Sequence, residues 1–279
     1  MSAQPVALVT GTSSGIGLHT ALGLAAASLH VVATMRDPGR GERLRAAAVN
    51  AGLAVEIRPL DVVDAGAAAD CVEQVLSDHG AIDVLVNNAG RGLVGTLEQV
   101  SLEDLRAQLE LNYVAVAGLT RLVLPAMRQA GSGRIITVSS VGGAVGQPFA
   151  DAYCGAKFAV EGLMQSLAPV AARFGVQVCI VEPAAVGSEF VANVAGVLDD
   201  QDPADPYADL LAAYLRRSAG AFASAQTPAD AAAVVVEAAT ATRPKFRWQT
   251  SPTAAALAGL SLGDLDGSRV LDQTATWLT

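Results

Sequence analysis

The chain has 279 residues, a formal net charge of −9, 52% hydrophobic residues and only 16% charged residues. This composition excludes a disordered acidic chain, because such chains contain few hydrophobic residues. It also argues against nucleic acid as the main partner, since no surplus of lysine and arginine is present to neutralise phosphates. No stretch approaches the ~20 consecutive apolar residues that a membrane-spanning helix needs. The length suits one large α/β domain over residues 1–279.

Short β-branched runs alternate along the chain with longer alanine-rich segments. Strands are predicted at residues 6–10, 31–34, 53–60, 82–86, 135–138 and 176–181, with a last edge strand at 246–248. Helices are predicted at about residues 15–27, 64–78, 102–129 (kinked at Pro125), 152–173 and 228–239. Residues 199–209, rich in Asp and Pro, are expected to be exposed. The alternation predicts a single-domain Rossmann-type α/β fold, a doubly wound parallel sheet of about seven strands with helices on both faces.

Cysteine and histidine usage gives no sign of a metal centre. The cysteines are odd in number and scattered, and they match neither a metal-ligand spacing nor a disulfide framework: Cys71, Cys154 and Cys179. The histidines are interpreted as structural or surface residues: His19, His30 and His79. No basic segment precedes an apolar run near the N-terminus, so we expect no secretory signal. We therefore predict a cytoplasmic protein with buried thiols and no metal site.

A glycine-rich segment separates the first predicted strand from the first predicted helix. It reads Thr10-Gly11-Thr12-Ser13-Ser14-Gly15-Ile16-Gly17. Glycines let a backbone turn sharply and approach a pyrophosphate, whose charge then faces the helix N-terminus. An ordinary strand-to-helix turn is the alternative, but the position after the first strand favours a dinucleotide-binding turn.

Four further motifs follow in order along the chain. Asn87-Asn88-Ala89-Gly90 ends the fourth strand, Asn112 lies in the long helix, Ser139-Ser140 ends the fifth strand, and Tyr153 and Lys157 form a Y-x-x-x-K pair. With these motifs the sequence resembles the short-chain dehydrogenase/reductase family from Val6 to about Phe190. It looks most like the branch of the 17β-hydroxysteroid dehydrogenase type 1 and the retinol dehydrogenases. The resemblance implies an NAD(P)-dependent oxidoreductase acting on CH–OH or C=O groups.

The Y-x-x-x-K pair has the spacing that proton transfer needs. Tyr153 and Lys157 are four residues apart on a predicted helix, hence on one face. A free tyrosine titrates near pKa ~10 and a nearby cation lowers that value, so Tyr153 is a candidate general acid and base. Ser140, at the carboxyl end of a parallel strand, is expected to hydrogen-bond the substrate oxygen. The resemblance implies that Lys157 also holds the nicotinamide ribose and that Asn112 orders a water linking Lys157 to solvent.

Each of these residues taken alone also has a structural explanation. A lysine can lie over an aromatic ring, a serine can cap a turn, and an asparagine can be a buried amide. A non-catalytic NADP(H)-binding sensor or scaffold is therefore the alternative function. The complete set of Asn112, Ser140, Tyr153 and Lys157 argues against it, because a pure binder has no need of all four.

The end of the second strand bears on the choice of nucleotide. It has no acid at Thr34 or Met35, and Arg36 follows, whose guanidinium suits the 2′-phosphate of NADP(H). The alternative is a surface ion pair of Arg36 with Asp37 or Glu42. NADP(H) is therefore expected, with NAD(H) possible. The resemblance implies this cofactor site, with Ser14 as a helper to Arg36 and Asp61 at the adenine: Gly11, Ser13, Ser14, Gly15, Ile16, Gly17, Arg36, Asp61, Val62, Asn88, Ala89, Gly90, Tyr153, Lys157, Pro183, Val186 and Ser188.

The segment after the sixth strand departs from the family pattern. Ala184 stands where the family has glycine, and Ser188 stands where it has threonine. An alanine disfavours positive φ, which predicts a displaced loop or a more loosely held cofactor. Residues 188–222 are rich in apolar side chains and follow the carboxyl end of a strand, so we expect a substrate-binding lid over a mostly apolar carbonyl or secondary alcohol. The alternative is that they only pack a helix onto the domain.

Two further expectations concern the lid and the quaternary structure. Arg217 aligns with a histidine by which the steroid branch recognises a distal oxygen, so steroid specificity is not carried over. If Arg217 points inward, it favours a ligand with a distal acidic group. The helices predicted at 102–129 and 152–173 carry apolar residues on more than one face, which predicts a homodimer or homotetramer.

Overall fold

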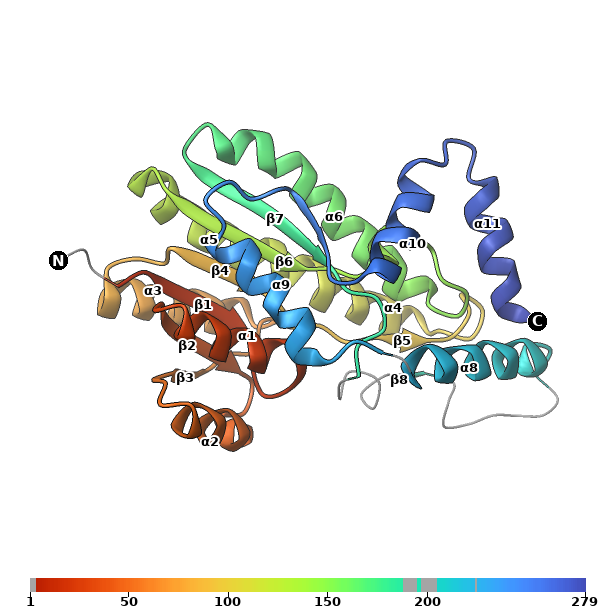
Figure 1. The fold of residues 1–279 in the computed structure, drawn as a ribbon, viewed down its shortest axis with the longest axis horizontal. Helices are drawn as coiled ribbons and strands as arrows, with labels where there is room; N and C mark the ends of the chain where they lie inside the picture. Colours follow the sequence, from red (N-terminus) through yellow and green to blue (C-terminus); the bar gives the residue numbers. More distant parts are fainter. Residues whose placement is uncertain (1–3, 188–194, 197–204, 224) are drawn as a thin grey trace.

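The computed structural model describes residues 4–187, 195–196, 205–223 and 225–279. Within these residues, seven strands form one parallel sheet in the order β3-β2-β1-β4-β6-β7-β9 (Figure 1). The strands are β1 (Val6–Thr10), β2 (His30–Met35), β3 (Glu56–Pro59), β4 (Val84–Asn87), β6 (Gly133–Val138), β7 (Val176–Glu182) and β9 (Arg247–Gln249). The predicted doubly wound Rossmann-type sheet is confirmed, including the late edge strand, β9, which pairs in parallel with β7.

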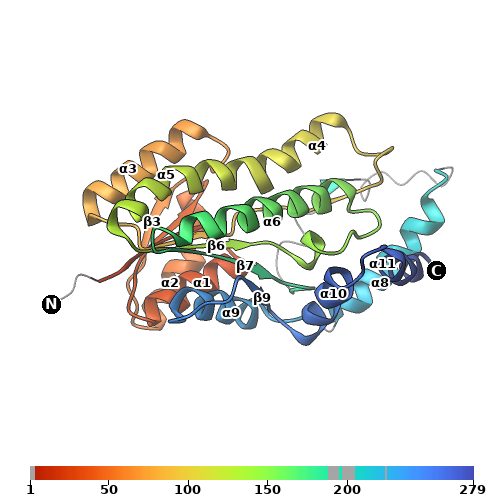
Figure 2. The same ribbon diagram turned by 90° about the horizontal axis from the view of Figure 1, so that it is seen from above.

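Helices cover both faces of the sheet, as Figure 2 shows. One layer holds α3 (Ala65–His79), α4 (Leu102–Leu109), α5 (Ala115–Ala130) and α6 (Asp151–Ala172), and the other holds α1 (Gly15–Ala26), α2 (Glu42–Asn50) and α9 (Pro228–Thr240). Consecutive residues of a strand point to opposite faces, so Leu8 packs in the α3–α5–α6 core and Val9 in the α1–α9 core. Burial on both faces explains the continuous apolar runs of central strands such as β1 and β4, whereas the edge strand β3 is only partly buried.

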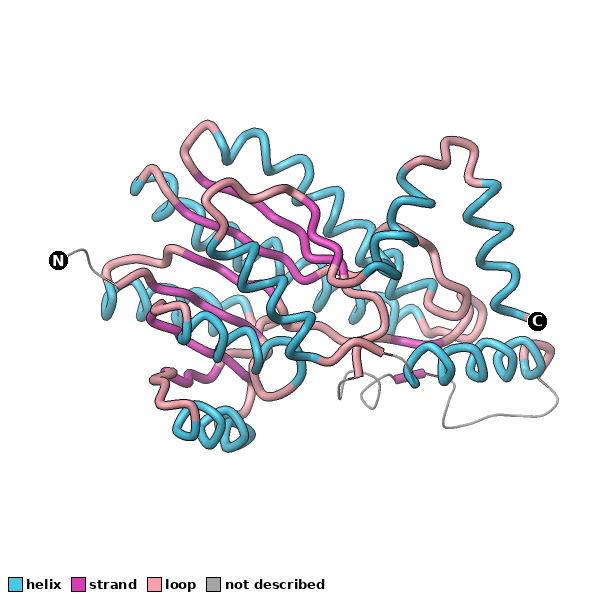
Figure 3. Tube along the Cα trace, viewed as in Figure 1, coloured by secondary structure: helices cyan, strands magenta, loops and turns pink. Residues whose placement is uncertain are grey.

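A third group of helices gathers at the end of the molecule opposite the N-terminus (Figure 1, Figure 3). It consists of α8 (Ala208–Ala223), α10 (Pro252–Leu262) and α11 (Ser268–Ala275). A short parallel pair, β5 (Leu93–Val94) with β8 (Ala195–Gly196), lies apart from the main sheet. These elements stand near the carboxyl ends of the strands, the edge at which open α/β sheets bind ligands.

The helix predicted at residues 102–129 contains a π-helical turn that the sequence did not predict. The helical run from Leu102 to Ala130 is interrupted by a π-helical turn at Glu110–Val114, whereas α5 continues through Pro125.

The helix α2 was not predicted either, because only Leu44 and Ala48 of its nine residues are buried and the apolar periodicity is faint. The predicted exposed segment 199–209 lies mostly outside the described residues.

Two expectations about the chain's chemistry can be compared with the structure. Cys71, Cys154 and Cys179 are buried free thiols, as predicted. Among the described residues, no helix is both long and apolar enough to cross a bilayer.

Candidate active site

The glycine turn is held against the end of β4 by an asparagine side chain. Gly11 and Gly15 both take positive φ, and a Cβ on Gly11 would lie only 2.9 Å from the Cα of Ala89. The Nδ2 of Asn88 donates to the carbonyl of Thr10 at 2.9 Å and to that of Gly11 at 3.0 Å. The side-chain amide of Asn88, a residue predicted to bind cofactor, therefore supports the turn that would hold the cofactor.

Thr10 organises the same junction, and the sequence analysis missed it. Its hydroxyl accepts hydrogen bonds from the backbone N–H groups of Asn88 and Ala89, each at 3.0 Å, and donates to the carbonyl of Val86 at 3.3 Å. The available signal was a hydroxyl residue at the carboxyl end of an otherwise apolar strand. Thr10 joins β1 to β4 where the two strands end.

The N-terminus of α1 is open to an anion. Ser14 is the N-cap residue, and its side chain makes no capping hydrogen bond to the helix. The N–H groups of a first helical turn carry a positive partial charge that attracts phosphate. Ser13, Gly15 and Ile16 flank this position and are partly exposed. Gly17 is buried and has no room for a Cβ beside the carbonyl of Gly11.

Arg36 ends the second strand with its side chain exposed. The two acids that could neutralise it are engaged elsewhere: Asp37 accepts from the backbone N–H of Gly39 at 2.8 Å, and Glu42 lies 3.9 Å from Arg45. Within the part of the chain that the structure describes, Arg36 forms no ion pair, so the surface pairing considered as an alternative is not observed.

Asp61 follows β3 at the same edge, and Val62 beside it is partly buried. The Oδ1 of Asp61 accepts from the backbone N–H of Val63 at 3.2 Å, which fixes the carboxylate at the turn. Among the described residues, no hydrogen bond reaches the second carboxylate oxygen.

Gly90 lies where two polar side chains of the predicted catalytic set converge. A Cβ at this position would be 2.7 Å from Oδ1 of Asn112 and 3.7 Å from Nζ of Lys157. Any side chain larger than hydrogen would displace the asparagine. The N-N-A-G motif therefore ends in glycine because Asn112 and Lys157 occupy the space beside it.

Asn112 is oriented by the π-helical turn that carries it and by a glutamine one turn earlier. Its Nδ2 donates to Oε1 of Gln108 at 2.9 Å and to the carbonyl of Arg91 at 3.1 Å. Its Oδ1 is buried and has no hydrogen-bond partner among the described residues. A buried unpaired acceptor beside a lysine is a place for an ordered water, and single π-turns inside helices are frequent at functional sites.

Lys157 is buried with 5% exposure, and its Nζ donates to the carbonyl of Val138 at 3.0 Å. The same Nζ lies 5.8 Å from the ring centroid of Tyr153. Burial lowers the pKa of Lys157 to about 8, although the negative charge of Glu161 acts in the opposite direction. Lys157 therefore keeps its positive charge beside the tyrosine at neutral pH but loses its proton more easily than an exposed lysine.

Tyr153 and Ser140 meet at the carboxyl edge of the sheet. Burial raises the pKa of Tyr153 above its usual value, while a hydrogen bond with the Ser140 side chain opposes that rise. The Oγ of Ser140 also accepts from the backbone N–H of Gly142 at 3.0 Å. The structure therefore brings together the four residues of the predicted catalytic set: Asn112, Ser140, Tyr153 and Lys157.

A buried charge cluster, formed by Ser139, Glu161, Glu182, Arg247 and Gln249, supports this set. The Oγ of Ser139 donates to Glu161 at 2.7 Å, and Nε2 of Gln249 donates to Glu182 at 2.6 Å. Arg247 donates to both carboxylates through Nη1. Burial raises the pKa of Glu161, although its hydrogen bonds from Arg247 and Ser139 act against that rise.

The sequence analysis missed this buried charge cluster. The available signal was an isolated charge in an apolar setting, as at Glu182 at the end of β7 and at Glu161 on the face of α6 that carries Lys157. No spacing rule links Arg247 to either acid, because the partners lie 86 and 65 residues away along the chain.

The loop after β7 is placed without the strain expected from Ala184. Outside glycine, only Ser28 and Phe149 take positive φ among the described residues, so the alanine does not need the conformation that it disfavours. The expectation of a displaced loop therefore loses its physical basis. Pro183 and Val186 are buried, and the carbonyl of Pro183 accepts from Val141 at 2.9 Å. Ser188 lies outside the described residues.

The described part of the expected lid packs beside Tyr153. The ring of Tyr214 on α8 lies 5.6 Å from that of Phe149, and Tyr214 is close enough to Tyr153 that its ionised form would raise the pKa of Tyr153. Phe149 is a bulky residue at φ 59, and backbone strain of this kind clusters at functional sites. The rest of the predicted lid, residues 188–194 and 197–204, lies outside the described residues.

Hydrogen bonds fasten the start of α8 to the loop after β5. The hydroxyl of Tyr207 donates to Glu98 at 2.6 Å, and Nε2 of Gln99 donates to Asp205 at 2.6 Å.

Arg217 does not point inward, which was one possibility from the sequence. It is exposed, with its guanidinium 4.6 Å above the ring of Trp277.

A family model described as short chain dehydrogenase matches residues 5–196. Human 17-beta-hydroxysteroid dehydrogenase type 1 is 39% identical over 95% of this chain and 83% of its own length. Human retinol dehydrogenase 8 is 37% identical over 96% of this chain and 88% of its own length. The chain belongs to the short-chain dehydrogenase/reductase family, and it is an oxidoreductase that acts on CH–OH or C=O groups with NAD(P). The resemblance inferred from the motifs is confirmed.

Solved structures agree with this assignment. A short-chain dehydrogenase from Streptomyces avermitilis has a TM-score of 0.81 at 33% identity and covers 99% of this chain and 97% of its own. A metagenomic short-chain oxidoreductase in complex with NADP has a TM-score of 0.70 at 29% identity, covering 88% and 96%. A short-chain dehydrogenase/reductase from Burkholderia phymatum in complex with NAD has a TM-score of 0.81 at 26% identity, covering 95% of each chain.

Proposed function

We propose that this protein interconverts a carbonyl and a secondary alcohol on a mostly apolar substrate, using NADP(H), with Tyr153 as general acid and base. The observation that carries this proposal is the convergence of Tyr153 with Ser140 on one side and with Lys157 and Asn112 on the other, at the carboxyl edge of the sheet. NAD(H) remains the second cofactor, because structural relatives are known with either nucleotide.

The residues along the carboxyl edge suit the parts of a dinucleotide. The glycine turn and the open N-terminus of α1 with Ser14 would hold the pyrophosphate, and the exposed, unpaired Arg36 would hold the 2′-phosphate. Lys157 would hold the ribose hydroxyls, and the loop with Pro183 and Val186 would lie against the nicotinamide. When bound, the nicotinamide supplies or accepts the hydride.

Proton transfer falls to the chain's own side chains. In reduction, the hydroxyl of Tyr153 donates its proton to the carbonyl oxygen while Ser140 donates a hydrogen bond to the same oxygen. In oxidation, the proton returns to Tyr153 from the alcohol. Burial raises the pKa of Tyr153, and the positive charge of Lys157, 5.8 Å from the ring centroid, would act in the opposite direction by favouring the phenolate. A water on the unpaired Oδ1 of Asn112 would pass protons between Lys157 and solvent.

An apolar substrate is supported by the walls beside Tyr153. Phe149 and Tyr214 form an aromatic contact there, and Arg217 is turned away onto Trp277. The relatives' names refer to hydroxysteroids and retinol, which are largely apolar alcohols. We expect bulky apolar ketones, polycyclic or aromatic, to be better substrates than sugars or short hydroxy acids.

The replacement of Tyr153 by phenylalanine tests the proposal. NADPH oxidation is measured over a panel of carbonyl compounds, and NADPH binding is followed separately by fluorescence. Tyr153→Phe should lower turnover by about 10²–10⁴-fold, the usual contribution of a general acid, with nearly unchanged NADPH binding. More than about a tenth of the wild-type rate in this variant would exclude Tyr153 as the proton donor. Tight NADPH binding without turnover of any carbonyl by the wild type would favour the sensor or scaffold.

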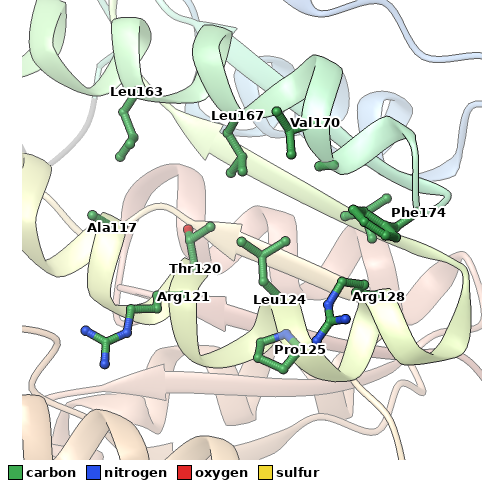
Figure 4. Close-up of a pocket in the computed structure, with 12 residues that line it drawn as sticks. Ala117, Thr120, Arg121, Leu124, Pro125, Arg128, Leu163, Leu167, Val170 and Phe174 are labelled. Atoms are coloured by element: carbon green, nitrogen blue, oxygen red, sulfur yellow. The ribbon is translucent and has the colours of Figure 1, made fainter.

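We also propose that the protein forms a homodimer or homotetramer through α5 and α6. An apolar groove of about 400 Å³ runs between these helices, lined by Leu124 and Pro125 on one side and by Leu167, Val170 and Phe174 on the other (Figure 4). Val170 is 60% exposed and Phe174 is 46% exposed, so large apolar side chains face solvent in the single chain. Covering such a surface is favourable.

Light scattering tests the assembly, with a monomer mass of 28.3 kDa as the reference. Val170→Asp should shift the protein toward the monomer because it places a charge in the groove. Val49→Asp is the matched control, since Val49 is 76% exposed on α2, away from α5 and α6. A wild-type monomer at micromolar concentration would contradict the proposal.

We further propose that the enzyme works in the cytoplasm, which its buried free thiols support.

A further inference from the structure

A second cluster of chemically active side chains lies at the amino-terminal edge of the sheet, away from the catalytic set. His30 begins β2, Glu56 begins β3, and His79 is the last residue of α3. In the parallel register Glu56 pairs with Val32, so His30, two residues earlier on β2, shares the face of Glu56. That face is the one on which α3 packs, and α3 brings His79 to the same place (Figure 2).

The three side chains point their ligand atoms at one another. The Nε2 atoms of His30 and His79 each lie 3.0 Å from the same oxygen, Oε2 of Glu56. All three ligand atoms lie within 4.8 Å of one another, and the two imidazole rings are tilted by 40° with their centroids 4.3 Å apart. A tetrahedral zinc ion with bonds of about 2.0 Å holds its ligand atoms about 3.3 Å apart. Small side-chain adjustments would therefore admit the ion.

The neighbouring charges orient the carboxylate. The Nε of Arg58 donates to Oε1 of Glu56 at 2.5 Å, which leaves Oε2 to face the two imidazoles. The Nη2 of Arg58 donates to Asp78 at 2.7 Å, so a second carboxylate helps to neutralise the guanidinium.

The balance of charge favours a cation. With neutral imidazoles, Glu56, Asp78 and Arg58 together leave one net negative charge. The Nη2 of Arg58 also lies 3.5 Å from Nε2 of His79, within hydrogen-bond reach of this ligand atom, so Arg58 will weaken the affinity and has to turn away from His79 when an ion binds. The side chains of His30, Glu56 and His79 are 34%, 30% and 21% exposed, so an ion and its water can enter from solvent.

We propose that His30, Glu56 and His79 form a binding site for Zn²⁺. Two imidazole nitrogens and one carboxylate oxygen are a set that zinc accepts, with water in the fourth position. The ligands come from three different elements, so the ion would tie β2 and β3 to the end of α3. The site stands at the opposite edge of the sheet from Tyr153. The sequence predicted no metal site because 26 and 23 residues separate the three ligands, a spacing that matches no motif.

Calorimetric titration of tag-free protein, treated with EDTA and dialysed, with zinc chloride tests this site. The wild type should bind one Zn²⁺ per chain. His30→Gln and His79→Gln should each weaken binding by at least about 10–100-fold, because even the loss of an outer partner has an effect of that size. His19→Gln is the matched control, since the chain has three histidines and His19 lies on α1 outside the cluster. Its affinity should equal that of the wild type.

A second measurement needs no variant and identifies the ligand atoms. Co²⁺ added to the wild type should give visible absorption bands of a nitrogen- and oxygen-ligated ion, without the thiolate charge-transfer band that a buried cysteine would produce. Circular dichroism verifies that each variant is folded. Absence of saturable Zn²⁺ binding, unchanged affinity in both cluster variants, or a thiolate band would overturn the proposal and leave the cluster as a set of hydrogen bonds.

Discussion

The molecule contains two charged clusters at opposite edges of its sheet, and they differ in their exposure to solvent. In the buried charge cluster at the carboxyl edge, the side chain of Glu161 is 4% exposed and that of Glu182 is 0% exposed. In the cluster at the amino-terminal edge, the Glu56 side chain is 30% exposed. An ionised group that cannot reach water needs a protein partner, whereas an exposed one can share solvent or take up an ion.

The hydrogen bonds follow this difference. In the buried charge cluster all four carboxylate oxygens have a protein donor: Ser139 and Arg247 on Glu161, and Arg247 and Gln249 on Glu182. These bonds join the end of β6, α6, the end of β7 and β9. Ser140 follows β6, Tyr153 lies on α6, and Pro183 follows β7. In the exposed cluster one oxygen of Glu56 is shared by two histidines instead. The buried charge cluster thus supports the elements that carry the predicted catalytic set, whereas the cluster of His30, Glu56 and His79 can take up the proposed ion.

The largest effect is expected when the buried charge cluster loses its only cation. Arg247→Leu leaves two buried carboxylates facing each other, and breaking a buried pair in this way typically costs about 3–5 kcal/mol. The free energy of unfolding is measured by urea denaturation. Arg58→Leu in the cluster at the amino-terminal edge is the comparison. The Arg58 side chain is itself only 13% exposed, but the carboxylates that it leaves, Glu56 and Asp78, are 30% and 55% exposed and keep access to water, so the loss should be smaller, about 1 kcal/mol. Equal losses in the two variants would show that burial is not what separates the clusters.

Arg36 extends the comparison to an exposed cation that forms no ion pair with any residue that the structure describes. Arg36→Asp should remove a charge-assisted contact and add repulsion to the 2′-phosphate, costing NADP(H) at least about 1.5–3 kcal/mol relative to NAD(H). The ratio of kcat/KM for the two cofactors measures this effect. Arg45→Asp, an equal charge change on an exposed residue of α2, is the control. If both variants leave the ratio unchanged, Arg36 does not face the ribose.

The sequence was informative where a function rests on local spacing. The glycine turn and the Tyr153–Lys157 pair lie within one turn or one helix, so their geometry follows from chain position. The strands were predicted because apolar runs buried on both faces are distinctive. Arg247 escaped prediction because its acids are 86 and 65 residues away along the chain. The π-turn at Asn112 escaped because its hydrogen bonds to Gln108 and Arg91 leave no periodic pattern.

A smaller effect links the buried charge cluster to catalysis through pH. Glu161 raises the pKa of Lys157, which burial lowers to about 8. Glu161→Gln removes that negative charge, so the lysine should lose its proton at lower pH, by up to about one pH unit, the low end of what a nearby charge produces. If activity needs protonated Lys157, the alkaline fall of kcat/KM for the cofactor, which reports the free enzyme, moves to lower pH.

The control for this pH shift is Glu237→Gln, which removes the same charge from an exposed position on α9, on the opposite face of the sheet. Its pH profile should match that of the wild type. A Glu161→Gln profile displaced to higher pH would reverse the sign and contradict the electrostatic argument. A loss of rate at every pH, with no displacement, would mean that Glu161 acts only by holding Ser139 in place.

The smallest coupling energy is expected at an ion pair that is exposed to solvent and belongs to no larger cluster. Glu42 and Arg45 lie three residues apart on α2, 3.9 Å from each other, with side chains 82% and 47% exposed. A double-mutant cycle of Glu42→Ala and Arg45→Ala should give a coupling energy of at most about 0.5 kcal/mol, because water solvates both charges and each side chain loses entropy when it is held. The coupling should fall further in about 1 M salt, where charges are screened beyond ~3 Å. A coupling near that of the Arg247 pairs would mean that proximity alone, and not burial, sets the strength of charge pairs in this fold.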